Sequence, residues 1–150
     1  MEFRVEKDPA MIPYVLSQIL DKCINGITLS DPDQPDNPIV YANEAFELIT
    51  GYDREEIIGR NCRFLQGEDR EQLEIERIRE ALREHKPTTV TLRNYRKDGE
   101  LFYNQFSIRP LFDPQGRLIY YLGTQFDVTE KVKAEEELRR LNALLAELEK

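Results

Sequence analysis

The spacing of apolar residues predicts a helix near each end of the chain. Residues 10–25 carry apolar side chains at helical intervals, and Asn25-Gly26 ends this predicted helix. From Thr129 onward there is neither Gly nor Pro, and leucines recur at the 3-4-3 spacing of a coiled-coil seam, at Leu138, Leu141, Leu145 and Leu148. The seam covers fewer than three heptads, so it is short for an isolated coiled coil.

The segment between these helices predicts an antiparallel sheet. Short apolar runs at 27–30 and 39–42 predict two strands. Alternating apolar residues over 88–126 predict three more strands, which the turn signals at 97–99 and 113–116 separate. The expected sheet therefore has five strands.

Helical spacing predicts that helices lie between the second and third strands, over 43–50, from Asp53 and over 69–85. Helices of this kind pack on one face of such a sheet, which gives an α+β domain. We divide the chain into an N-terminal flanking helix (1–25), a core (26–128) and a C-terminal helix (129–150).

Composition narrows the classes of partner and compartment. A chain of 150 residues suits one domain, and its formal net charge of −8 argues against nucleic acid or an anionic membrane surface as a partner. Two cysteines, Cys23 and Cys62, do not make a disulfide framework and fit a reducing compartment. There is no apolar run of about 18 residues and no secretory signal pattern, so we expect a cytoplasmic protein.

Polar and reactive residues are densest between Gly59 and Gly67, where Cys62 stands between Asn61 and Arg63. A neighbouring arginine can lower the pKa of a thiol and make it nucleophilic, whereas the alternative is a buried thiol in a polar loop. A thiol enzyme would have to pair Cys62 with His85, the only histidine, although a cation is also favoured at a helix end. We expect no enzyme, and these residues supply too few ligands for a metal site.

The run Gly59-Arg60-Asn61-Cys62-Arg63-Phe64-Leu65-Gln66 resembles the signature of LOV (light-oxygen-voltage) domains, a class of the PAS fold that binds flavin and senses blue light. Similar stretches accompany it in order, at 41–46, 50–52, 93–99 and 123–129. With its flanking helices, the chain resembles a bacterial short LOV photoreceptor. The resemblance implies a PAS fold and a non-covalently bound FMN.

The resemblance also implies a role for each site residue. Cys62 resembles the cysteine whose sulfur bonds flavin C4a in light, and Gln125 resembles the glutamine at flavin O4 and N5. The phosphate would be held by Arg63 and Arg79, the ribityl chain by Asn61 and Gln66, and the pyrimidine edge by Asn94 and Asn104. The expected apolar walls are Phe64, Leu65, Phe106, Ile108 and Leu122.

These residue types suit those roles. Asn94 and Asn104 lie five residues on either side of Gly99, so we expect them nearly opposite each other across a turn. Each amide offers a donor and an acceptor, as the flavin edge requires, whereas without the resemblance both would be read as solvent-facing strand amides. Arginines carry forked donors that match a phosphate. The other arginines of this region are read as ordinary surface residues: Arg60, Arg70, Arg77 and Arg83.

Gln125 is the expected switch. Bond formation at C4a turns flavin N5 from an acceptor into a donor, so rotation of the Gln125 amide would restore the hydrogen bond. The change would pass through 127–129 to the C-terminal helix and to a homodimer interface made by the terminal helices, which we favour over a monomer. The alternative function is a PAS-type flavin redox sensor that does not use the cysteine for light.

Overall fold

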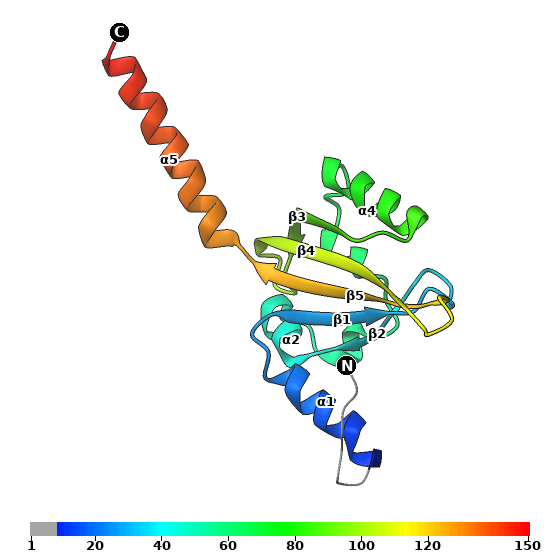
Figure 1. Cartoon of the computed structure of the whole chain (residues 1–150). Helices are drawn as coiled ribbons and strands as arrows, with labels where there is room; N and C mark the ends of the chain where they lie inside the picture. Colours follow the sequence, from blue (N-terminus) through cyan, green and yellow to red (C-terminus); the bar gives the residue numbers. More distant parts are fainter. Residues whose placement is uncertain (1–8) are drawn as a thin grey trace.

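The computed structural model describes residues 9–150 (Figure 1). Five antiparallel strands form one sheet in the order β2-β1-β5-β4-β3, which confirms the predicted sheet. The strands are β1 (Gly26–Ser30), β2 (Ile39–Ala42), β3 (Thr88–Tyr95), β4 (Leu101–Phe112) and β5 (Leu118–Asp127). Residues 1–8 of the predicted N-terminal segment lie outside the described residues.

The helices that connect β2 to β3 pack on one face of this sheet, as predicted (Figure 1). They are α2 (Glu44–Thr50), α3 (Arg54–Ile57), the 3-10 helix η2 (Cys62–Gln66) and α4 (Leu73–Glu84). The chain also has the two flanking helices, α1 (Ile12–Asp21), preceded by a 3-10 turn η1 (Pro9–Met11), and α5 (Thr129–Leu148).

The core consists of two apolar clusters under these helices. One joins α4 to the inner face of β3, β4 and β5 and consists of Ile75, Val90, Leu92, Phe106, Ile108 and Tyr121. The other packs β2 against α2, α3 and η2 and consists of Ile39, Ala42, Phe46, Ile57 and Leu65. Cys62 contacts both clusters, so it lies where they meet.

The helix predicted over 10–25 ends earlier than expected, at Asp21. Asn43, which is fully buried, donates from Nδ2 to the carbonyl oxygens of Leu20 (2.8 Å) and Asn25 (3.0 Å). Its Oδ1 accepts from Ile27 N at 2.8 Å. This one side chain therefore binds the carbonyls at the end of α1 and the start of β1, and the residues between them form a connection rather than more helix.

The helix predicted over 69–85 also begins later, at Leu73. Asp69 accepts from Arg93 Nε at 2.7 Å and from the Tyr95 hydroxyl at 2.7 Å, and these bonds lower the pKa of its carboxyl to about 2. Gln72 donates from Nε2 to the Arg93 carbonyl at 2.9 Å. Residues 69–72 thus form a loop fastened to β3, which holds them out of the helix.

Both flanking helices keep their apolar side chains exposed. None of the α1 residues is buried, and in α5 only Thr129 is. The seam leucines Leu138, Leu141, Leu145 and Leu148 are between 46% and 81% exposed, and α5 projects away from the sheet (Figure 1). Within residues 9–150, no helix combines the length and the apolarity needed to cross a membrane.

Candidate functional site

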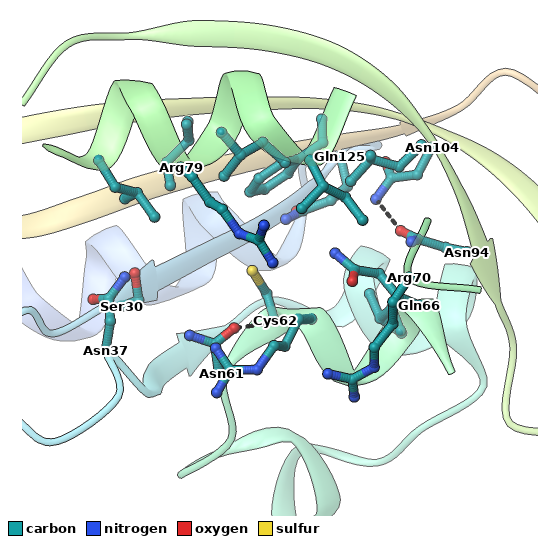
Figure 2. Close-up of a pocket in the computed structure, with 18 residues that line it drawn as sticks. Ser30, Asn37, Asn61, Cys62, Gln66, Arg70, Arg79, Asn94, Asn104 and Gln125 are labelled. Atoms are coloured by element: carbon teal, nitrogen blue, oxygen red, sulfur yellow. Dashed lines mark hydrogen bonds between the residues drawn. The ribbon is translucent and has the colours of Figure 1, made fainter. Parts of the chain in front are cut away.

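A cavity of about 160 Å³ lies between the inner face of the sheet and the helices η2 and α4 (Figure 2). One wall is apolar and comes from α4 and the strands: Ile75, Ile78, Leu82, Leu92, Phe106 and Ile108. The remaining lining is mostly polar: Ser30, Asn37, Asn61, Cys62, Arg63, Gln66, Arg70, Arg79, Asn94, Asn104 and Gln125, with Leu65. An apolar slot with a few fixed polar groups is typical of a small-molecule site.

Cys62 begins η2, and its thiol lies in this cavity (Figure 2). Desolvation by burial raises the pKa of the thiol to about 11, although Arg63 is next to it. The sequence-based alternative of a thiol with a lowered pKa is therefore wrong, because burial outweighs the attraction of the guanidinium. Cys62 is a neutral thiol at physiological pH.

His85 does not line the cavity. It follows α4 as the C-cap with a left-handed backbone (φ 52°), and its backbone N–H donates to the Ala81 carbonyl. This matches the predicted place at a helix end. No Cys62–His85 pair exists to support thiol catalysis.

The two asparagines predicted for the pyrimidine edge meet on the inner face of the sheet. Asn104 Nδ2 donates to Asn94 Oδ1 at 3.0 Å (Figure 2), and both residues are buried. They are diagonal neighbours, because Asn104 pairs with Leu92 and Asn94 pairs with Phe102. The two asparagines were predicted to lie nearly opposite each other, and the structure offsets them by two residues because the turn is centred on Asp98 rather than on Gly99. Asn104 Oδ1 is buried without a hydrogen-bond partner.

Gln125 lines the same cavity from β5 and is 1% exposed. Its Nε2 donates to Thr28 Oγ1 at 3.3 Å, and its Oε1 is buried without a hydrogen-bond partner. A buried acceptor left unpaired is costly. The amide therefore has one end held by the protein and one end available to a ligand.

Asn61 and Gln66 frame the cavity from the two ends of η2. Asn61 is the N-cap of η2, and its Oδ1 accepts from Arg63 N at 3.0 Å. Its Nδ2 donates to the Asp36 carbonyl at 2.7 Å, so both ends of this amide are occupied. Gln66 is buried at the far end of η2 and lines the cavity. Only Gln66 of this pair is turned into the core.

Three arginines line the opening of the cavity. Arg63 pairs with Asp36, whose pKa this hydrogen bond lowers, and Arg79 Nη1 lies 3.6 Å from Glu76 Oε2. Figure 2 shows the Arg79 guanidinium above Cys62. The third is Arg70, whose Nε donates to the Gly67 carbonyl at 3.1 Å. Arg70 is exposed, as predicted for a surface arginine, and it also borders the cavity because residues 69–72 form the loop beside it rather than a helical turn.

Two of the predicted apolar walls lie elsewhere. Leu122 is three residues from Gln125 on the same strand, so strand alternation puts it on the outer face of the sheet, opposite Leu29. Phe64 packs edge-on against Tyr52, with ring centroids 5.1 Å apart, and under the Arg60 guanidinium. Leu65, Phe106 and Ile108 do line the cavity, as predicted.

Sequence reasoning missed several lining residues. Three of them come from α4, Ile75, Ile78 and Leu82. Their i, i+3, i+7 spacing predicts a buried face of this helix, and in the structure that face lines the cavity. Leu92, Asn37 and Ser30 carried no signal of their own, although Asn37 Oδ1 is buried without a hydrogen-bond partner.

Comparison with known proteins agrees with this geometry. Residues 24–130 match the family described as "PAS domain". A "Blue-light photoreceptor" of Listeria monocytogenes is 42% identical over 144 residues, which is 93% of this chain and 55% of the relative. The chain spans between 13% and 55% of the length of the curated relatives that it matches.

Two solved structures are also similar. One is an RNA-binding light-oxygen-voltage receptor, with a TM-score of 0.85 and 38% identity over 98% of this chain and 41% of that one. The other is the light-oxygen-voltage domain of "Flavin Analogue Sheds Light on Light-Oxygen-Voltage Domain Mechanism", with a TM-score of 0.73 and 42% identity over 89% of this chain and 98% of that one.

The pKa of Cys62 predicts how its alkylation depends on pH. A thiol with a pKa of about 11 has a roughly hundredfold smaller thiolate fraction at pH 8 than one with the model-peptide value of 9.0. In flavin-free protein carrying Cys23→Ser, the rate of iodoacetamide labelling should keep rising up to about pH 11. Mass spectrometry measures the rate, and circular dichroism at each pH checks that the chain stays folded. A rate that levels off below pH 9 would contradict the burial argument.

Proposed function

We propose that this chain, which belongs to the LOV class of the PAS family, is a blue-light photoreceptor domain that holds FMN in the cavity beside Cys62. In this reading it is a binding and signalling module rather than an enzyme. The proposal is supported by the composition of the cavity lining, which brings together a neutral thiol, an apolar wall and unpaired amide oxygens.

The unpaired polar atoms are the observation that carries the proposal. Asn104 Oδ1 and Gln125 Oε1 are buried in the cavity lining with no partner in the protein. Such atoms are retained in a core when something else pairs with them. An isoalloxazine ring has apolar faces and an edge of alternating donors and acceptors, so it fits this lining.

The chain divides the work of holding FMN among three groups. Asn94, Asn104 and Gln125 meet the polar edge of the ring, and the wall from α4 and β4 meets one of its faces. The phosphate would be bound by Arg63, Arg70 and Arg79 at the opening of the cavity, because their forked donors match its oxygens. Arg63 and Arg79 now pair with Asp36 and Glu76, and they would exchange these partners for the phosphate. Asn61 and Gln66 lie between these groups, beside the ribityl chain.

Bound FMN would supply a light-excited ring that accepts the Cys62 sulfur at C4a and the thiol proton at N5. The protein delivers both from one group, because Cys62 stays protonated until that moment. The burial that raises the pKa of Cys62 also excludes water from the sulfur. Gln125 would then face a donor at N5 in place of an acceptor, and because its amide carries both a donor and an acceptor, a half-turn would restore the hydrogen bond.

The relay to α5 is short. Gln125 is two residues before Asp127, the last residue of β5, and α5 starts at Thr129. Asp127 accepts from Thr129 N at 3.0 Å and from Arg96 Nη2 at 2.7 Å. A change at Gln125 would therefore be transmitted to the residue whose carboxylate binds the first N–H of α5.

The output surface is a homodimer interface formed by the flanking helices. Their exposed leucines and the apolar residues of α1, such as Val15 and Ile19, form unpartnered stripes on a protein of modest size. A second copy of the chain presents the same stripes, so a two-fold contact is self-complementary.

The absorption spectrum before and after blue light distinguishes this function from that of a flavin redox sensor. The purified chain should carry a flavin whose visible absorption band bleaches under blue light and returns in the dark. Cys62→Ala should keep the flavin and lose the reversible bleaching, because no sulfur remains to bond C4a. A spectrum insensitive to light would favour the redox sensor, and bleaching that persisted in Cys62→Ala would reject the role of that thiol.

Replacing the arginines distinguishes a phosphate site from general binding. Arg63→Ala and Arg79→Ala should each weaken FMN binding by about tenfold, because charge-assisted hydrogen bonds to the phosphate are lost. Riboflavin, which has no phosphate, should bind these variants as it binds the parent chain. Arg77→Ala, on α4 but outside the cavity lining, is the matched control. Equal losses for FMN and riboflavin in a fluorescence titration would contradict the phosphate assignment.

The dimer proposal predicts an effect of charge in the leucine seam. Leu141→Glu together with Leu145→Glu should halve the mass measured by light scattering after size exclusion, since carboxylates cannot be buried in an apolar contact. Asn142→Glu, on the same helix outside the seam, should leave the mass unchanged. A parent chain that elutes with the mass of one copy would refute the dimer.

A further inference from the structure

Gln125 makes a buried contact with Thr28, a residue that has no role in the proposed switch so far. Thr28, which is 4% exposed, lies on β1 opposite Gly123 of β5, and Gln125 lies opposite Gly26 of β1. Gln125 Nε2 donates to Thr28 Oγ1 at 3.3 Å. The contact therefore joins two adjacent strands on the inner face of the sheet, at the end of the amide that is turned away from a ligand.

Two glycines leave the space in which this contact forms. A Cβ at Gly123 would lie 2.5 Å from Thr28 Oγ1, 3.0 Å from Phe106 Cε2 and 3.1 Å from Gln125 Nε2, so it would crowd both the hydroxyl and the amide. A Cβ at Gly26 would lie 3.3 Å from Gln125 Oε1. Neither glycine has a positive φ, so space rather than backbone conformation requires them. Gly26, Thr28 and Gly123 thus form what we call the amide socket of Gln125.

A hydroxyl suits this socket because it both donates and accepts. In the orientation seen here the Thr28 hydroxyl accepts from Nε2, and Oε1 is left for the ligand. After a half-turn of the amide, the hydroxyl would rotate and donate to Oε1, which leaves Nε2 for the ligand. Valine, which has nearly the same shape, would leave the buried end of the amide unpaired in both orientations.

We propose that Thr28 is the positioning residue of the Gln125 switch. Its hydroxyl pairs with whichever end of the amide faces away from the flavin, so the amide rotates without losing a buried hydrogen bond. The use of this pairing in light rests on the proposed function, whereas the pairing of hydroxyl and amide is a property of the chain alone. A merely structural Thr28 would fill space, and valine would replace it without consequence.

The first readout does not need light. The side-chain amide protons of Gln125, followed by NMR in flavin-free protein, should exchange with solvent at least tenfold faster in Thr28→Val than in the parent chain. Thr28→Ser restores the hydroxyl and should stay within twofold of the parent. Thr124→Val, a β5 substitution on the outer face, is the matched control and should change nothing.

The second readout is the dark recovery of the flavin-loaded protein after blue light. Because flavin N5 accepts in the dark and donates in the adduct, Nε2 would face the flavin in the dark orientation, and Oε1 would face it after rotation, as it faces the cavity in the flavin-free structure. In Thr28→Val the end of the amide that faces residue 28 would lose its partner, and that end is Oε1 in the dark and Nε2 after rotation. An unpaired N–H is tolerated less well than an unpaired carbonyl, so the adduct state loses more and recovery should be roughly three to ten times faster. Thr28→Ser should recover at the parent rate.

Gly123→Ala tests the socket while keeping the hydroxyl, because the added Cβ would separate Thr28 from Gln125. It should reproduce the faster amide exchange of Thr28→Val. The proposal is overturned if Thr28→Val leaves the amide exchange at the parent value, or if Thr28→Ser behaves like Thr28→Val. A parent chain that fails to bleach in light rejects the proposed function, while the exchange comparison in flavin-free protein still decides the role of Thr28.

Discussion

The site depends on the position of β5 between β1 and β4. Gln125 is paired with Gly26 on one side and with Phe106 on the other, so the side chains of Gln125 and Phe106 share the inner face. The same register pairs Asn104 with Asp127. Because side chains alternate along a strand, a slip of β5 by one residue would turn Gln125 out of the cavity, away from Asn104 and Phe106 on β4. The register of β5 with β4 therefore brings these three lining side chains together.

A cavity in the middle of a small core has a stability cost that its ligand offsets. The two apolar clusters meet at Cys62, where continuous packing would otherwise fill the space. Instead the lining keeps amide oxygens without partners, each a cost to the folded chain. A ligand that pairs with them binds the folded state and not the unfolded one, so it stabilises the protein in proportion to its affinity. Fold and ligand are thermodynamically linked in such a design.

Most of the sheet could be predicted from the sequence because its signals are local. Alternation and two Gly-containing turns define β3, β4 and β5, and the Asn25-Gly26 signal stands at the start of β1. The errors arose where long-range side chains override local pattern. Asn43, which is 23 residues further along the chain, binds the Leu20 carbonyl at the end of α1. Asp69 is held by Arg93 of β3 and does not enter α4. Nothing in the spacing of residues 69–72 reveals a partner on another strand.

For the site residues, too, local signals could be predicted and long-range contacts could not. Residues of the cysteine run could be assigned by resemblance, yet the pKa of Cys62 could not, since it depends on how tightly both clusters enclose the sulfur. The prediction that Leu122 forms part of the apolar wall is wrong on local grounds alone, because strand alternation from Gln125 already puts Leu122 on the outer face. Thr28 could not be found from sequence, since a lone strand threonine has no signal. Only the register of β1 with β5 brings its hydroxyl to the amide.

The geometry also explains why a change at the ligand edge would reach α5 rather than dissipate in the sheet. Asn104 and Asp127 are direct cross-strand partners, so a residue that lines the cavity and the residue that accepts from Thr129 N at the start of α5 share one rung of the ladder. Arg96 holds Asp127 at 2.7 Å, and its guanidinium lies 4.6 Å from the centre of the Phe102 ring. Phe102 in turn pairs with Asn94. The side chains that meet the ligand edge and those that fix the start of the helix therefore occupy neighbouring positions on the same strands. The amide rotation proposed for Gln125 would therefore occur two residues from Asp127 on β5, and a relay to α5 would need no long pathway through the core.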